Sequence, residues 1–91
     1  ISTTAPQALL LLNDPFIRGV AKALSERIRS SGDGILDTRV RQLYYLLYGR
    51  SPRGEEVAAA RSFLGTAGTD VERWDEYCHA LLCTSELIYR N

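Results

Sequence analysis

Apolar residues recur at spacings of three and four along most of the chain, and glycine and proline interrupt this pattern at short intervals. Such spacing gathers apolar side chains on one face of a helix. No segment shows the sustained alternation of apolar and polar residues that is typical of a strand, and no internal repeat is visible. The 91 residues correspond to one small domain. The sequence therefore predicts a single all-α domain over residues 1–91, a compact bundle of about five helices.

The interruptions predict where these helices begin and end. Asp14 followed by Pro15, and Ser51 followed by Pro52, each supply an N-cap with proline at the first helical position. Asp70 is a third predicted N-cap, and Gly49 suits a left-handed residue after a helix. The predicted helices cover Ala5–Leu12, Pro15 to about Ser30, Leu36 to Tyr48, Pro52 to about Leu64, and a segment from Val71 onward, with a final turn at Ser85–Tyr89.

Each longer helix has a predicted core face. On the second helix this face consists of Phe16, Ile17, Val20, Ala21, Leu24 and Ile28. On the third it consists of Val40, Leu43, Tyr44 and Leu47, and on the fourth of Val57, Ala60 and Leu64. On the fifth it consists of Val71, Trp74, Cys78, Leu81 and Leu82, with Trp74 as the expected core anchor.

Several short segments, in order along the chain, carry a family resemblance. They are residues 4–9 (TAPQAL), residues 12–16 (LNDPF), Leu43-Tyr44, Gly49-Arg50-Ser51-Pro52 with Glu56, Trp74, Ala80-Leu81-Leu82 and Ser85-Glu86-Leu87. Together they resemble a domain of unknown function found C-terminally in large planctomycete-type proteins, often alongside cytochrome c-like modules. Cys83 and Leu87 depart from that pattern, which tends to have asparagine and an aromatic residue there. The resemblance implies an exported protein, periplasmic or at the cell surface, and no catalytic residue.

Charge and composition restrict the partners that we expect. Eleven basic residues balance eleven acidic ones, so no overall field would draw the chain to nucleic acid or to an anionic membrane. No apolar run approaches the roughly 18–20 residues that span a bilayer. The chain lacks methionine, even at position 1, and starts at Ile1 with a pattern already under way. We therefore expect a fragment of a larger parent protein, with other domains of that parent as partners.

The cysteines and the single histidine lie close together in the sequence, but they indicate no cofactor. The run from Cys78 to Cys83 lacks the Cys-x-x-Cys-His motif of covalent haem. Asp75, His79 and Cys83 recur every four residues along one ridge of the fifth helix, away from the Trp74 stripe. Asp75 and Cys83 would be about 12 Å apart along the axis, too far to share one metal ion. We expect a solvated ridge with an Asp75–His79 pair, and neither a metal site nor a catalytic one.

Three surfaces are candidates for binding. The first is Arg41, Tyr45 and Tyr48 on the flank of the third helix, since tyrosine beside arginine is favoured at protein interfaces and on sugars. The second is Arg18, Lys22 and Arg29 on the second helix, opposite its apolar face, where they could follow an anionic polymer. The third is Leu9–Leu12, whose consecutive leucines must point all around a helix and could contact the parent protein.

These features leave three functional hypotheses. The favoured one is a non-catalytic helical module that holds or orients its neighbours through hydrophobic and tyrosine-rich contacts. The first alternative is a polysaccharide-binding module. It would use either Arg41, Tyr45 and Tyr48 or the basic stripe that Arg18, Lys22 and Arg29 form on the second helix. The second alternative is part of an active site that the upstream chain completes, with Asp75, His79 or Cys83 contributing.

Overall fold

Four helices make up the described part of the chain, which comprises residues 13–30, 34–65 and 69–84 of a computed structural model. They are α2 (Pro15–Ser30), α3 (Leu36–Tyr48), α4 (Gly54–Leu64) and α5 (Val71–Cys83). No strand occurs within these residues, so the all-α prediction is confirmed. The helix expected at Ala5–Leu12, the leucine run within it and the turn expected at Ser85–Tyr89 lie outside the described residues.

Three of the four predicted helix caps, Asp14, Gly49 and Asp70, are confirmed. The Asp14 carboxylate accepts a hydrogen bond from the Phe16 N–H at 2.9 Å, and the Asp70 carboxylate accepts one from the Arg73 N–H at 3.3 Å. Gly49 is left-handed, with φ 71°, and its N–H donates to the Tyr45 carbonyl. These polar and glycine caps satisfy backbone groups that have no partner within the helix.

The start of α4 differs from the prediction. The helix begins at Gly54, and Arg53 rather than Ser51 occupies the N-cap position. The Glu56 carboxylate accepts the Arg53 N–H at 2.7 Å, while the Ser51 hydroxyl donates to Tyr45 instead. A carboxylate at the third helical position thus stabilises this N-terminus, and the Ser51–Pro52 pair remains outside the helix.

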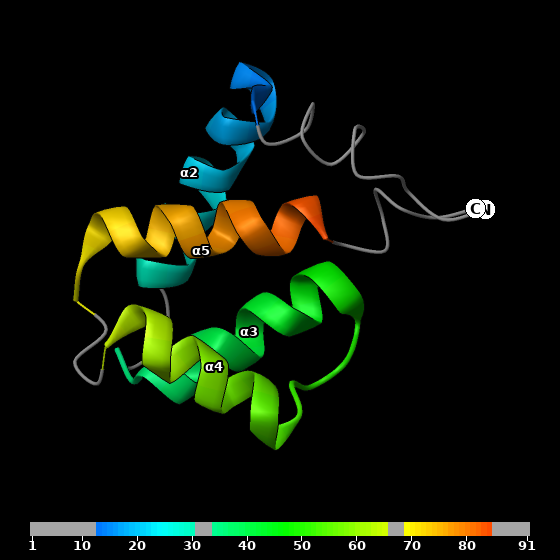
Figure 1. The fold of residues 1–91 in the computed structure, drawn as a ribbon, viewed down its shortest axis with the longest axis vertical. Coiled ribbons are helices and arrows are strands. Elements are labelled where there is room, and N and C mark those ends of the chain that lie inside the picture. Colours follow the sequence, from blue (N-terminus) through cyan, green and yellow to red (C-terminus); the bar gives the residue numbers. More distant parts are fainter. Residues whose placement is uncertain (1–12, 31–33, 66–68, 85–91) are drawn as a thin grey trace.

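Helix α5 is the centre of the domain. It crosses α2, and α3 and α4 lie along its other side (Figure 1). The most extensive packing is between α2 and α5, where Ala21 and Ser25 are fully buried and their small side chains allow close approach. None of the described helices is both long and apolar enough to cross a membrane.

The predicted core is correct for α3 and only partly correct for α2 and α5. Val40, Leu43, Tyr44 and Leu47 are all buried, as are Ala60, Leu64, Trp74, Cys78 and Leu82. Phe16, however, is 73% exposed, Val20 is 37% exposed, and Val71 is exposed as well. On α2 the buried face comprises Ala21, Ser25 and Ile28. It therefore lies closer than the predicted face to the basic stripe formed by Arg18, Lys22 and Arg29.

Candidate functional site between α2 and α3

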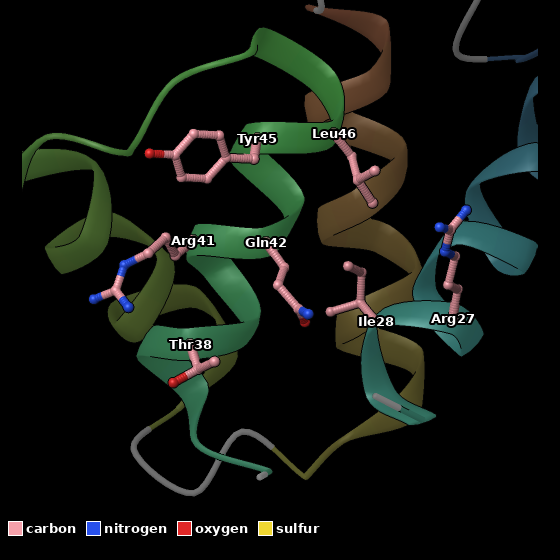
Figure 2. A pocket seen from close by; sticks show the side chains of 7 residues that line it. All are labelled: Arg27, Ile28, Thr38, Arg41, Gln42, Tyr45 and Leu46. Atoms are coloured by element: carbon pink, nitrogen blue, oxygen red, sulfur yellow. The ribbon is translucent and has the colours of Figure 1, made fainter. Parts of the chain in front are cut away.

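A groove of about 370 Å³ separates α2 from α3 and contains two of the predicted binding residues (Figure 2). Its lining consists of Arg27, Ile28, Thr38, Arg41, Gln42, Tyr45 and Leu46. Five of these come from α3 at spacings of one, three and four residues, so one side of that helix forms most of the wall. We refer to this feature as the α2–α3 groove.

The floor of the groove is largely apolar. Ile28 is buried and faces Gln42 across the gap between the helices, and Leu46 extends toward α2 above them (Figure 2). Leu46 is 46% exposed, so a large part of its side chain remains in contact with water. An apolar group of a partner placed over Leu46 and Ile28 would remove that surface from water, which is favourable.

The rim of the groove is cationic. Arg27 projects from α2 and Arg41 from α3, on opposite sides of the groove (Figure 2). Within the described part of the chain neither guanidinium takes part in an ion pair, and no carboxylate lines the groove. Guanidinium groups bind carboxylates bidentately, so the groove is suited to a ligand with acidic groups around an apolar centre.

Tyr45 is the most exposed aromatic ring of α3, at 55%. Its side chain and that of Arg41 extend along the side of α3 away from α2, whereas Gln42 and Leu46 extend toward α2 (Figure 2). The Tyr45 hydroxyl accepts a hydrogen bond from the Ser51 hydroxyl at 3.1 Å, which fixes the end of the ring. The ring itself is therefore open to solvent and held in place.

Tyr48 does not join Arg41 and Tyr45. Its hydroxyl donates to the Leu81 carbonyl at 3.1 Å and lies 3.2 Å from the Thr84 hydroxyl, both at the end of α5. Its ring packs 5.1 Å from that of Tyr44. Tyr48 thus links α3 to α5, and of the predicted trio only Arg41 and Tyr45 reach the groove.

The basic stripe of α2 also lies elsewhere than predicted. Arg18 and Lys22 line a smaller cavity of about 80 Å³ beside Asp75 and Glu76 of α5, so the stripe borders the α2–α5 interface. Arg29 donates through Nε to the hydroxyl of buried Ser25 at 3.2 Å. The prediction that these three residues lie opposite the packed face is wrong, because α2 buries Ser25 rather than Phe16 and Val20.

The ridge of Asp75, His79 and Cys83 is not the solvated surface that we expected. His79 and Cys83 are buried, and the His79 Nε2 and Asp75 Oδ1 atoms are both buried without a hydrogen-bond partner in the described part of the chain. The prediction is wrong because α5 lies at the centre of the domain and is covered on more than one side. Its ridge therefore packs against α2 instead of facing water.

The thiols are poor candidates for nucleophiles. Burial, and secondarily the nearby Asp75 carboxylate, raises the pKa of Cys78 to about 12. Burial also raises the pKa of the Cys83 thiol. Both cysteines are free, and a thiol with a raised pKa carries little of the thiolate form that attacks electrophiles or binds metals.

One cluster at the α3–α4 junction had no role assigned from the sequence. Arg50 binds Glu56 through two hydrogen bonds of 2.9 and 3.1 Å, and its guanidinium lies 5.5 Å from the Tyr44 ring and 5.6 Å from the Tyr48 ring. The Arg50 hydrogen bonds and the Arg53 backbone N–H lower the pKa of Glu56 to about 2. In the sequence, the available signal for this contact was the six-residue separation of Arg50 and Glu56 across Pro52. We interpret the pair as structural and refer to it as the Arg50–Glu56 clamp.

Comparison with known proteins places these features in a family. Residues 1–64 match the family model described as PSD1, protein of unknown function (DUF1553). The match includes α2, α3, α4, the α2–α3 groove and the Arg50–Glu56 clamp, and it ends before α5. No curated protein and no solved structure matches the chain. Because the family model covers more than half of its residues, the chain belongs to the PSD1 family of proteins of unknown function.

Proposed function

We propose that this domain is a non-catalytic helical interaction module of a larger exported protein, and that its α2–α3 groove holds an acidic, partly apolar segment of the same parent protein. The observation that carries the proposal is the composition of the groove. Leu46 and Ile28 offer an apolar floor, and Arg27 and Arg41, neither of which forms an ion pair within the described part of the chain, lie at opposite edges of the groove. Export and placement in a larger parent rest on the family resemblance.

Binding is favoured over catalysis by the chemistry of the groove. Its lining residues include no carboxylate, imidazole or thiol, which are the usual groups for general acid–base or nucleophilic steps. The two cysteines lie outside it, with raised pKa values. These facts also weigh against the hypothesis that Cys83 contributes a nucleophile to an active site completed by the upstream chain.

The test is to prepare the rest of the parent protein separately and to measure its binding to this domain by isothermal titration calorimetry. Leu46→Ser removes the exposed apolar side chain of the groove. Val71→Ser is its matched control, because Val71 on α5 is 47% exposed, against 46% for Leu46, and lies outside the groove. We expect Leu46→Ser to weaken binding about tenfold and Val71→Ser to leave it unchanged. No complex, or equal losses in both variants, would refute the proposal.

A polysaccharide is the second candidate ligand, and it is favoured by one specific observation. The Tyr45 ring is more than half exposed and is fixed by Ser51, so it offers a flat surface on which a sugar can stack, with Arg41 beside it. Tyr45→Ala should abolish retention in glycan affinity electrophoresis, whereas Tyr45→Phe should keep it. Unchanged migration of the alanine variant would exclude this candidate.

A further inference from the structure

The apolar face of α2 is only partly buried within the described chain. Phe16, Val20, Leu24 and Ile28 recur every four residues, so their side chains follow one another along a single ridge of the helix. Exposure falls along this ridge from 73% at Phe16 and 37% at Val20 to 1% at Ile28, with Leu24 half-buried between them. We refer to these four residues as the α2 ridge. It passes from solvent at its N-terminal end to the core at its C-terminal end.

The buried end of the α2 ridge is the α2–α3 groove. Ile28 belongs to the groove floor, and Arg27, three residues after Leu24, lies at the groove's edge. The exposed end lies on the first turns of α2, which project beyond the crossing with α5 (Figure 1). The ridge and the groove therefore form one apolar surface that is larger than the groove alone.

Charge is confined to one end of this surface. Arg27 and Arg41 lie at opposite edges of the groove, and neither forms an ion pair within the described part of the chain. Beside the ridge, the exposed residues Gly19 and Ala23 are small and uncharged, and a Cβ added at Gly19 would meet nothing within 4 Å. Small residues let a neighbouring backbone approach closely. An occupant thus needs an apolar face along the ridge and acidic groups only at the groove.

A helix is the backbone conformation that fits this surface. No strand occurs in the described part of the chain, so an extended segment would find no sheet edge there, and its N–H and C=O groups would lie unpaired over apolar side chains. A helix satisfies its own backbone groups, and its apolar residues pack between ridge residues that are four apart. At about 1.5 Å per residue the α2 ridge is about 18 Å long, which corresponds to about three turns of a partner helix.

We propose that the occupant of this surface is an amphipathic α-helix of the parent protein, about three turns long, which lies along the α2 ridge and places acidic residues between Arg27 and Arg41. The inference rests on the proposed function. It adds the conformation of the docked segment and assigns Phe16 and Val20 to the interface. Docking removes both side chains from water, which is favourable.

The test is hydrogen exchange, followed by mass spectrometry, of the intact parent protein in its wild-type form and with Val20→Ser. We expect one segment outside this domain to exchange about fivefold faster in the variant, because loss of the Val20 side chain weakens docking. That segment should have apolar residues at spacings of three and four together with Asp or Glu. A released segment without this pattern, or no released segment, would overturn the proposal.

Two further variants complete the comparison. Phe16→Ser removes the most exposed side chain of the ridge and should release the same segment about tenfold. Val71→Ser is the matched control for Val20→Ser, because Val71 is also exposed but belongs to α5. Equal release by the two valine variants would overturn the proposal. The amides of α5 should be equally protected in Val20→Ser, Phe16→Ser and the wild type, which shows that the domain stays folded.

Leu46→Ser separates this inference from the proposed function. If Leu46→Ser releases a segment of the parent and Val20→Ser does not, the groove is a docking site but the helix along the α2 ridge is overturned. If neither variant releases a segment, both proposals are overturned.

Other occupants of the ridge are tested with the 91-residue chain alone. We expect a monomer in light scattering and no co-sedimentation with phosphatidylglycerol vesicles. A dimer that Phe16→Ser dissociates would overturn the proposal in favour of a second copy of the chain. Vesicle binding that Phe16→Ser abolishes would overturn it in favour of a membrane surface.

Discussion

The clamp between Arg50 and Glu56 allows a quantitative prediction about stability and pH. Replacing Glu56 with glutamine keeps an oxygen that can accept the Arg53 N–H but removes the charge that Arg50 binds at 2.9 and 3.1 Å. The pKa of Glu56 falls from 4.5 to about 2 on folding, mainly because of the Arg50 hydrogen bonds and then the Arg53 N–H. Each pH unit corresponds to about 1.4 kcal/mol, so an unscreened pair would contribute about 3.4 kcal/mol.

Solvent reduces this figure. The Arg50 side chain is 41% exposed and that of Glu56 is 23% exposed, and pairs in such positions are screened by water and salt. We therefore expect Glu56→Gln to lower the free energy of unfolding by about 1–2 kcal/mol at pH 7. Because the folded-state pKa is depressed, this contribution is complete above about pH 4.5 and disappears as the pH falls toward about 2.

The measurement is urea unfolding, followed by circular dichroism, of the wild-type chain and the variant between pH 7 and pH 2.5. The difference between the two isolates Glu56 from the other carboxylates, and we expect less than half of it to remain at about pH 3. Glu55→Gln is the matched control, since Glu55 is exposed, adjacent, and outside every ion pair of the described chain. A difference that is independent of pH, or one of equal size for Glu55→Gln, would refute the reasoning.

Three further predictions concern the links between helices and the buried thiol. Tyr48→Phe loses the hydrogen bond to the Leu81 carbonyl and should lower the free energy of unfolding by about 1 kcal/mol in urea titrations. Gly49→Ala places a side chain at φ 71° and should cost about 1 kcal/mol in the same assay, whereas Gly54→Ala, at an ordinary φ with open space around it, should be neutral or stabilising. The Cys78 thiol, with its pKa raised to about 12, should react with a thiol reagent at pH 8 far more slowly in the folded chain than in urea; equal rates would contradict its burial.

Much of the secondary structure was determined locally, and the sequence therefore predicted it. Asp14 and Asp70 cap their helices because a short acidic side chain reaches the free N–H groups of the first turn, whatever lies beyond it. Gly49 ends α3 because it adopts a left-handed conformation at little cost. The start of α4 was missed because its stabilising groups, Glu56 and Arg50, come from positions three residues after and before the N-cap residue.

The tertiary structure decided which face of each helix is buried and which side chains meet. The amphipathic pattern of α2 indicated Phe16 and Val20 as core residues, but close packing on α5 needs small side chains, and Ala21 and Ser25 provide them. That choice brings Arg18 and Lys22 to the carboxylates of α5. His79 and Cys83 are buried because three helices surround α5. Their burial therefore depends on how those helices pack and not on the sequence of α5 itself. The sequence thus determined the helices through contacts within a few residues, whereas both cavities depend on pairs of helices whose relative placement only packing could fix.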